Sequence, residues 1–349
     1  MGNVIAYGTD ASDNPIKKLR IKRRVITSDD VEIKILYCGI CHSDIHLAKN
    51  DWGVTQYPIV PGHEIVGKII KLGRNVTKFK IGDIVGVGCI VDSCKSCNAC
   101  NEGLEQYCEN GSTGTYNSRD IKYGGITYGG YSEKIVVNQN FVLSIPKNLP
   151  LISVPPLLCA GITVWSPLKQ WKASNKDIVG IIGLGGLGHM GLKLSKALGA
   201  KVILITTSSA KGKDSLTLGA DKFLLSTDKE QLQEYQNSFD LLLNTVPNNH
   251  NLNIYLNLLK RDGTMVLLGA LESFEKAQLQ GISLILQRKR LAGSIIGGIK
   301  ETQEMLNFCG QHNITSNVEL IKPTQINNAY KRVLSNDVKY RFVIDFTSH

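Results

Sequence analysis

A run of four cysteines in the first third of the chain imposes a tight local fold. Two, two and seven residues separate its members, which are Cys94, Cys97, Cys100 and Cys108. Packing alone does not produce such regular spacing, whereas four thiolates with short spacers suit tetrahedral zinc. The rival is an iron–sulfur cluster, but the bacterial ferredoxin pattern needs three residues before its last cysteine and a proline after it. The run therefore predicts a closed structural zinc lobe at about residues 89–110, with no position open to substrate.

Length and charge limit the remaining possibilities. At roughly 150 residues per domain, 349 residues suggest two domains. The formal net charge of +10 would suit an anionic partner. However, its densest basic stretches, Lys17–Arg24 and Arg288–Arg290, are short and contain no interleaved aromatic residues, as base stacking would require. We therefore expect no nucleic-acid partner.

Targeting signals are not expected. The first ten residues have no basic segment followed by an apolar one, and Ala6 stands where myristoylation needs Ser or Thr. The most apolar run, Ile178–Leu192, contains six glycines and His189 and is too short for a span of about 20 residues. We expect a cytoplasmic protein with no membrane partner, where nine cysteines favour metal binding or catalysis over disulfides.

The pattern of apolar residues changes near Pro155-Pro156. Before this point, alternating runs such as Val31–Tyr37 and Ile65–Leu72 predict a β-rich domain. After it, short apolar strands alternate with helical segments, which predicts βαβ units and a parallel sheet, hence an α/β protein. A glycine-rich turn then follows the strand predicted at Ile178–Ile182. Its residues are Gly183, Leu184, Gly185, Gly186, Leu187 and Gly188.

This turn precedes a predicted helix that runs to Ala197. A strand, a G-x-G-x-x-G turn and a helix are the arrangement of a Rossmann dinucleotide-binding domain, in which the pyrophosphate lies at the helix N-terminus. A glycine-rich turn with a packing role alone is the alternative. The motif thus predicts a doubly wound parallel sheet that binds a nicotinamide dinucleotide.

The next strand ends in hydroxyl residues and lysines instead of an acid. Thr206, Thr207, Ser208 and Ser209 are followed by Lys211 and Lys213. An NAD site normally has Asp or Glu here, which would repel a 2′-phosphate. The segment therefore favours NADP(H) over NAD(H). If these lysines only start an exposed helix, the choice of cofactor stays open.

Three further segments hold scattered soft and imidazole ligands. They are Cys41–Asp44, Gly62–Glu64 and Leu158–Gly161, and their Cys and His residues have the composition of a catalytic zinc site with mixed coordination. An isolated Cys or His is more often a core or surface residue than a ligand. Because folding would have to bring the segments together, their spacing does not establish a site.

The chain resembles the zinc-dependent medium-chain alcohol dehydrogenases, especially the cinnamyl alcohol dehydrogenase branch with its bacterial NADPH-dependent aldehyde reductases. The matching segments run nearly end to end and are Tyr37–Asp44, Tyr57–Glu64, Gly82–Gly88, Gly103–Cys108, Tyr128–Ser132, Pro156–Thr163 and Gly298–Thr302. The resemblance implies a GroES-like catalytic domain over residues 1–155 and 296–349, a Rossmann domain over 156–295, and a homodimer.

The resemblance also assigns roles near the metal. It implies that Cys41, His63 and Cys159 hold a catalytic zinc, with water, a substrate oxygen or Glu64 as the fourth ligand, giving two zinc ions per chain. Asp44 would accept a hydrogen bond from the ligating histidine. Ser43 would pass a proton to the nascent alkoxide, and His46 would complete the relay to solvent.

Cofactor and substrate positions follow in the same way. The resemblance places His42 at the pyrophosphate, Thr163 near the nicotinamide, and Thr207, Ser208 and Lys211 at the 2′-phosphate. The substrate pocket would include Trp52, Ile295 and Ile296, with isoleucine where the branch often has an aromatic residue. An NADP(H)-dependent reductase of aromatic or aliphatic aldehydes is the leading hypothesis.

Two other functions are compatible with parts of this sequence. An NAD-dependent polyol or secondary-alcohol dehydrogenase would keep the fold, but the missing acid after the second strand argues against it. A zinc-ribbon nucleic-acid-binding module would show salt-sensitive binding to DNA or RNA and no nicotinamide oxidation.

Overall fold

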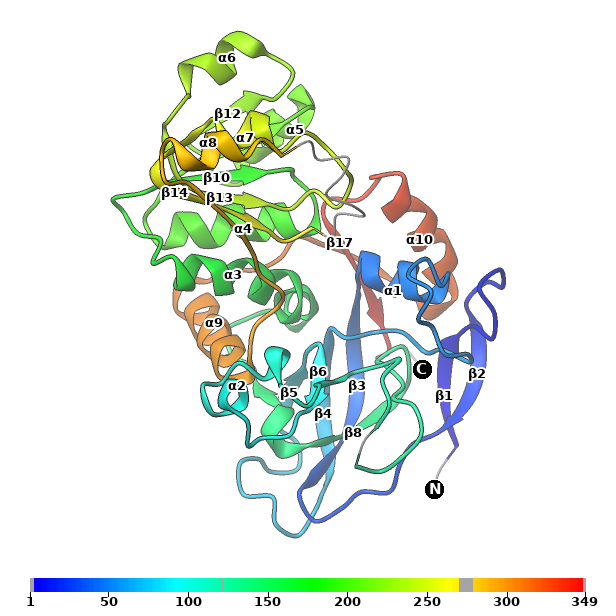
Figure 1. Cartoon of the computed structure of the whole chain (residues 1–349). Helices are drawn as coiled ribbons and strands as arrows, with labels where there is room; N and C mark the ends of the chain where they lie inside the picture. The colour runs from blue at the N-terminus through cyan, green and yellow to red at the C-terminus, as the bar shows by residue number, and fades with distance from the viewer. Residues whose placement is uncertain (1–2, 121, 270–278, 348–349) are drawn as a thin grey trace. The chain divides into compact units, whose positions relative to one another are not determined.

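The computed structural model describes residues 3–120, 122–269 and 279–347. They form two units (Figure 1), of which the first joins Met1–Cys159 to Gly297–His349 and the second is Ala160–Ile296. The sequence-based boundaries lie at 155/156 and 295/296. Residues 156–159 group with the first unit in the structure because the short helix η4 (Pro155–Leu158) packs against three strands of that unit.

The first unit is built around β3 (Asp30–Ile40), which the sequence predicts as a strand together with β4 (Ile65–Leu72). Val31, Ile33 and Ile35 are fully buried, as the two-residue period of a strand requires when one face meets a core. The strand order is β16-β17-β3-β4-β5-β9, and β8 also pairs with β3. The remaining strands of this sheet are β5 (Ile84–Val87), β8 (Lys134–Asn138), β9 (Leu143–Ser144), β16 (Val318–Ile321) and β17 (Arg341–Asp345).

Smaller elements surround this sheet (Figure 1). Two two-stranded sheets are formed by β1 (Asn3–Gly8) with β2 (Lys17–Lys22) and by β6 (Ile90–Asp92) with β7 (Thr113–Gly114). The α-helices are α1 (His42–Ala48), α2 (Asn98–Asn101), α9 (Ile299–His312) and α10 (Ile326–Leu334). The 3₁₀ turns besides η4 are η1 (Glu105–Tyr107), η2 (Gln139–Phe141), η3 (Leu151–Ser153) and η6 (Pro323–Gln325).

The second unit is a parallel six-stranded sheet in the order β12-β11-β10-β13-β14-β15. Numbered along the unit this order is 3-2-1-4-5-6, the doubly wound Rossmann arrangement, which confirms the predicted fold class. Its strands are β10 (Ile178–Ile182), β11 (Lys201–Thr206), β12 (Lys222–Leu225), β13 (Phe239–Asn244), β14 (Leu259–Leu267) and β15 (Arg290–Gly293).

Helices flank the second sheet. Among them, α4 packs on β10 and β11, α5 on β11 and β12, and α7 on β14 (Figure 1). Phe239, Leu242 and Met265 lie in the fully buried core. The described helices of this unit are α3 (Ala160–Gln170), α4 (Gly186–Ala197), α5 (Ser209–Thr217), α6 (Lys229–Glu234), α7 (Asn253–Leu256) and α8 (Gly281–Ile285).

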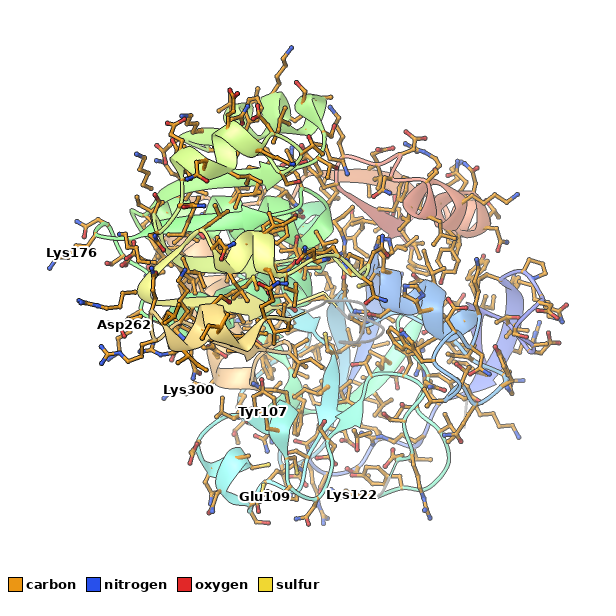
Figure 2. The ribbon with its side chains drawn as sticks, turned by 45° about the horizontal axis from the view of Figure 1, so that its top comes forward. Tyr107, Glu109, Lys122, Lys176, Asp262 and Lys300 are labelled. Atoms are coloured by element: carbon orange, nitrogen blue, oxygen red, sulfur yellow. The ribbon has the colours of Figure 1, made fainter. Side chains whose placement is uncertain are left out.

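The basic stretches noted in the sequence have ordinary structural surroundings. The lysines of β2 are exposed, on a strand that alternates with buried Ile21. In the second stretch, Arg288 Nη2 lies 2.8 Å from Asp262 Oδ2, and Lys289 Nζ donates to the carbonyl of Leu256 at 2.9 Å. Other charged side chains, such as Lys176, point outward singly (Figure 2).

No single helix in the described ranges is long and apolar enough to cross a membrane. One bent pair, Leu151–Leu158 with Ala160–Gln170, reaches that threshold by length and composition only.

Candidate active site and metal centres

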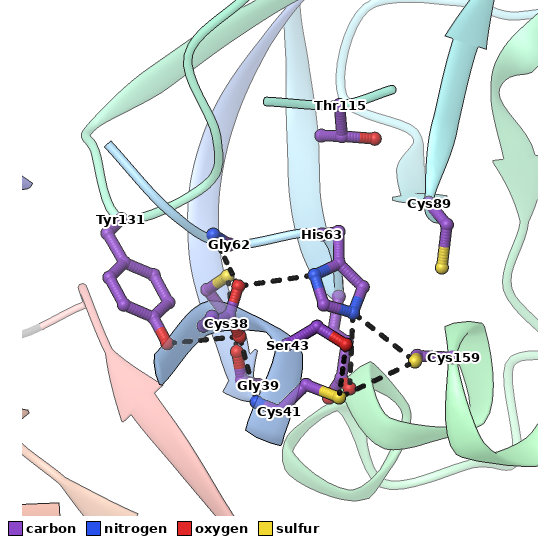
Figure 3. A network of polar contacts seen from close by, with 12 residues as sticks. Cys38, Gly39, Cys41, Ser43, Gly62, His63, Cys89, Thr115, Tyr131 and Cys159 are labelled. Atoms are coloured by element: carbon purple, nitrogen blue, oxygen red, sulfur yellow. Dashed lines mark hydrogen bonds and ion pairs between the residues drawn. The ribbon is translucent and has the colours of Figure 1, made fainter. Parts of the chain in front are cut away.

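Four potential metal ligands from three segments of the first unit meet in its interior. Cys41 caps α1, His63 and Glu64 immediately precede β4, and Cys159 follows η4. All four side chains are buried, and their ligand atoms lie within 4.8 Å of one another (Figure 3). The structure thus brings together the scattered residues that spacing did not connect.

The contacts within this group leave room for a shared ion. His63 Nε2 lies 3.2 Å from Cys159 Sγ, and the two sulfur atoms of Cys41 and Cys159 are 3.9 Å apart. The hydrogen bond between these thiols lowers the pKa of Cys41 well below its usual value and raises the pKa of Cys159. Two sulfurs and one imidazole nitrogen are the ligand set of a catalytic zinc that keeps one position for substrate.

The carboxylate of Asp44, which is not one of the four potential ligands, orients His63. Asp44, which is fully buried, accepts from His63 Nδ1 at 3.2 Å through its Oδ1 atom. The same oxygen accepts from the backbone N–H of Gly62 at 3.0 Å, and Oδ2 accepts from that of Cys41 at 2.8 Å. With its Nδ1 bound to Asp44, His63 presents Nε2 to the sulfur atoms, as a zinc ligand must.

Arg341 also belongs to this site, although the sequence pattern predicted no role for it. It lies on β17, is 4% exposed, and forms an ion pair with Glu64. Burial raises the pKa of Glu64, while the guanidinium opposes this shift. A Cβ atom on Gly39, in the neighbouring strand β3, would collide with Glu64 Oε2. This glycine therefore leaves space for the carboxylate beside the sulfur ligands.

Helix α1 carries the residues predicted for proton transfer. Ser43 Oγ lies 3.7 Å from Cys41 Sγ, at the edge of the ligand group. One helical turn later, the half-buried His46 bonds through Nδ1 to Asp51 Oδ2 at 2.8 Å. Its ring centre is 6.2 Å from that of His42 and 5.4 Å from that of Trp52. Asp51, which had no predicted role, thus orients the histidine.

Cys89, which is not among the predicted zinc ligands, also lies beside this ligand group (Figure 3). Its Sγ is 3.7 Å from the carbonyl of Leu158, the residue before Cys159. The hydrogen bond with Cys159 lowers the pKa of Cys89.

The four-cysteine run folds into a separate metal centre. Its sulfur atoms lie within 4.8 Å of one another, with Cys94 Sγ 3.8 Å from Cys100 Sγ. Backbone N–H groups of Ser96 and Cys97 point at Cys94 Sγ from 3.5 and 3.3 Å, and such bonds lower the pKa of Cys94 to about 5. Four thiolates in this arrangement fill a tetrahedral zinc site.

In the second unit, the glycine-rich turn connects β10 to α4. Gly183 has a φ of +89°, which favours glycine, and a side chain on Gly188 would collide with the Gly183 carbonyl. At Gly185, which caps α4, an added Cβ would meet open space. The backbone at the helix N-terminus is therefore accessible to a pyrophosphate. Leu184, Gly186 and Leu187 complete the turn and the first residues of α4.

The predicted 2′-phosphate residues follow β11. Thr207 is exposed, and Ser208 caps α5 by accepting from the backbone N–H of Lys211 at 3.3 Å. The Lys211 side chain is half-buried at the first turn of this helix. Thr163 lies in α3 with 7% exposure.

The three residues predicted for the substrate pocket lie in different units. Trp52 belongs to the first unit and is 45% exposed. Ile295 and Ile296 are the last two residues of the second unit.

Comparison with known proteins identifies the family. An alcohol dehydrogenase GroES-like domain matches residues 27–147, and a zinc-binding dehydrogenase domain matches residues 186–311. NADP-dependent alcohol dehydrogenase C of Mycobacterium bovis is 52% identical over 348 residues, which cover 100% of both chains. The chain belongs to the zinc-binding alcohol dehydrogenase family. The resemblance noted in the sequence is thereby confirmed.

Two further relatives of this alcohol dehydrogenase represent the expected branch. Aldehyde reductase YahK of Escherichia coli is 51% identical, and the match covers 97% of each chain. A cinnamyl alcohol dehydrogenase from Helicobacter pylori, solved in complex with NADP(H), superposes with a TM-score of 0.91. It is 41% identical, and the match covers 99% of both chains.

Proposed function

We propose that this alcohol dehydrogenase is an NADP(H)-dependent aldehyde reductase that interconverts aldehydes and primary alcohols. The observation that carries the proposal is that the buried side chains of Cys41, His63 and Cys159 lie together, beside the hydroxyl of Ser43. A Rossmann unit with an accessible glycine turn in the same chain supplies a place for the dinucleotide. The names of the Escherichia coli and Mycobacterium relatives support the aldehyde substrate and the cofactor.

The chain's own residues account for the proton chemistry. When bound, zinc supplies a Lewis acid that polarises the substrate carbonyl. Ser43 is placed at the edge of the ligand group, where its hydroxyl donates a proton to the carbonyl oxygen as carbon receives hydride. His46, on the same face of α1 and 31% exposed at its side chain, exchanges the relayed proton with solvent. Asp51 holds the ring in this position.

The preference for NADPH is tested by reversing the charge of Lys211. Because a hydrogen bond to a charged group contributes about 1.5–3 kcal/mol, Lys211→Glu is expected to lower kcat/KM for NADPH by about tenfold or more. The value for NADH should change little, since NADH lacks the 2′-phosphate. Lys229→Glu, an exposed position at the start of α6, is the matched control. A wild-type protein that prefers NADH would contradict the assignment.

We further propose a homodimer formed through the second unit. The edge strand of its sheet, β15, pairs with β14 on one side, and no second partner is found among the described residues. In and directly after α8, the helix that precedes β15 in the chain, Ile282, Ile285 and Leu286 expose 58–75% of their surface. Exposed apolar side chains and a free strand edge in the same unit are suited to a second copy of the chain. Light scattering should give about twice 38.3 kDa, and Ile285→Asp should shift the mass toward one chain.

A cytosolic location completes the proposal. Both metal centres require reduced cysteines, six in total, and such thiols persist in a reducing compartment.

A further inference from the structure

The Asp44 carboxylate connects two of the catalytic zinc ligands, and one of its four hydrogen bonds comes from a tyrosine. Asp44 Oδ1 binds the ring of His63, and Oδ2 binds the backbone N–H of Cys41. Oδ2 also accepts from the hydroxyl of Tyr131 at 3.3 Å. The side-chain donors that reach Asp44 within hydrogen-bond geometry, among the described residues, are His63 and Tyr131. In Figure 3, Tyr131 and Cys159 lie on opposite sides of His63.

The backbone fixes Tyr131 against the loop that carries His63. Gly129, Gly130 and Tyr131 donate to the carbonyls of residues 60, 62 and 61 at 2.7–2.9 Å. Side chains on either glycine would collide with this loop or with Ile65. The two glycines therefore permit the close contact, which explains the Tyr128–Ser132 segment that the sequence singled out.

Burial keeps the phenol in one place. Tyr131 has 0% exposure, and its carbonyl accepts from the backbone N–H of Tyr7 at 2.7 Å. Burial, with the Asp44 carboxylate adding to it, holds the pKa of Tyr131 well above its usual value, so the hydroxyl keeps its proton and remains a donor.

Two other buried tyrosines surround the same carboxylate. Tyr116 stacks on the His63 ring with a centroid distance of 5.8 Å, and Tyr330 lies on α10. Neither hydroxyl has a partner within hydrogen-bond geometry among the described residues, although both lie in the electrostatic neighbourhood of Asp44. Tyr131 is thus distinguished from its neighbours by the bond to Asp44, and not by its residue type or burial.

We propose that Tyr131 is a positioning residue that holds the Asp44 carboxylate, and through it the His63 ring, in the geometry that retains the catalytic zinc. Without the phenol, Asp44 Oδ2 would keep the Cys41 backbone bond alone. The carboxylate could then rotate, and its restraint on the His63 ring would weaken. Residues beyond the direct ligands typically contribute 10–100-fold to metal affinity. The inference rests on the proposed zinc-dependent function.

The test measures how fast each zinc leaves the intact protein for a chromogenic chelator. The Cys159→Ser variant identifies the phase that belongs to the catalytic ion. Tyr131→Phe is expected to accelerate this phase by about tenfold, the lower end of the range for outer residues. Release from the four-cysteine centre should not change, so this second ion serves as an internal control for folding. Tyr330→Phe removes a buried hydroxyl that makes no hydrogen bond to Asp44 and should change neither phase.

A double-mutant cycle separates positioning from packing. On an Asp44→Asn background, adding Tyr131→Phe is expected to have little further effect on zinc release, because the carboxylate it acts through is gone. If Tyr131→Phe accelerates zinc release on the Asp44→Asn background as much as it does in the wild type, to within about twofold, Tyr131 acts by packing and the proposal is overturned. Equal catalytic-zinc release from Tyr131→Phe and Tyr330→Phe would also overturn it. In either case, a wild-type protein that releases two zinc ions would leave the proposed zinc-dependent function standing. A wild-type protein that releases only one zinc ion would overturn both the role of Tyr131 and the proposed function.

Discussion

Cys159→Ser is expected to remove the catalytic zinc and to lower the rate of aldehyde reduction by about 10³-fold or more. Cys159 Sγ contacts both the His63 ring and Cys41 Sγ, so its loss leaves the ligand group without its central member. A Lewis acid contributes several kcal/mol to stabilising the charge that develops on a carbonyl oxygen, and each 1.36 kcal/mol is tenfold in rate. Steady-state oxidation of NADPH measures the rate, and elemental analysis should find the structural zinc retained.

Cys309→Ser provides the control for loss of a buried thiol. Cys309 lies in α9 and belongs to neither metal group, so this variant should keep two zinc ions and its activity. Full turnover by a Cys159→Ser protein that holds no catalytic zinc would contradict the proposed mechanism.

Ser43→Ala is expected to slow the chemical step by about 10²–10⁴-fold, the range for losing a group that transfers a proton in the transition state. The zinc content should stay at two, because Ser43 Oγ contacts Cys41 Sγ at 3.7 Å without belonging to the ligand set. Single-turnover kinetics with saturating NADPH isolate this step from product release.

Ser43→Thr is the matched variant, since it keeps a hydroxyl at the same position on α1. It should retain most of the activity that Ser43→Ala loses. A rate unchanged by Ser43→Ala, when chemistry limits turnover, would exclude Ser43 from proton transfer.

Much of the fold was predictable because its strongest signals are local. The six-residue turn at Gly183 lies between one strand and one helix, and the four cysteines lie within one lobe, so their geometry follows from short-range spacing. The strands β12 and β15, by contrast, have weak signals in the sequence. Each has four residues and begins with an exposed basic side chain, Lys222 or Arg290, so little apolar pattern marks it.

The catalytic ligand group could not be derived from spacing. His63 and Cys159 are separated by 96 residues, and they meet because η4 packs on β4, the strand that begins just after His63 and Glu64. The resemblance to a known family identified these residues, whereas their types and intervals were compatible with core positions.

Arg341 was not predicted, because its partner is also distant in the sequence. It lies 277 residues from Glu64, and the pairing of β17 with β3 places it there. A signal was present, since Arg341 begins the buried strand Arg-Phe-Val-Ile near the end of the chain. A charged residue in such a strand needs a buried partner. Finding that partner from the sequence would require knowing the register in which β17 pairs with β3.

The central claim is that zinc bound by Cys41, His63 and Cys159 makes this chain an NADPH-dependent aldehyde reductase. The most direct measurement strips the protein with a chelator and titrates zinc back while following NADPH oxidation by cinnamaldehyde or a simple aliphatic aldehyde. Activity should be lost with the metal and return as both centres fill to two zinc ions per chain. Undiminished turnover by zinc-free protein, or no aldehyde-dependent NADPH oxidation by protein holding two zinc ions, would contradict the account.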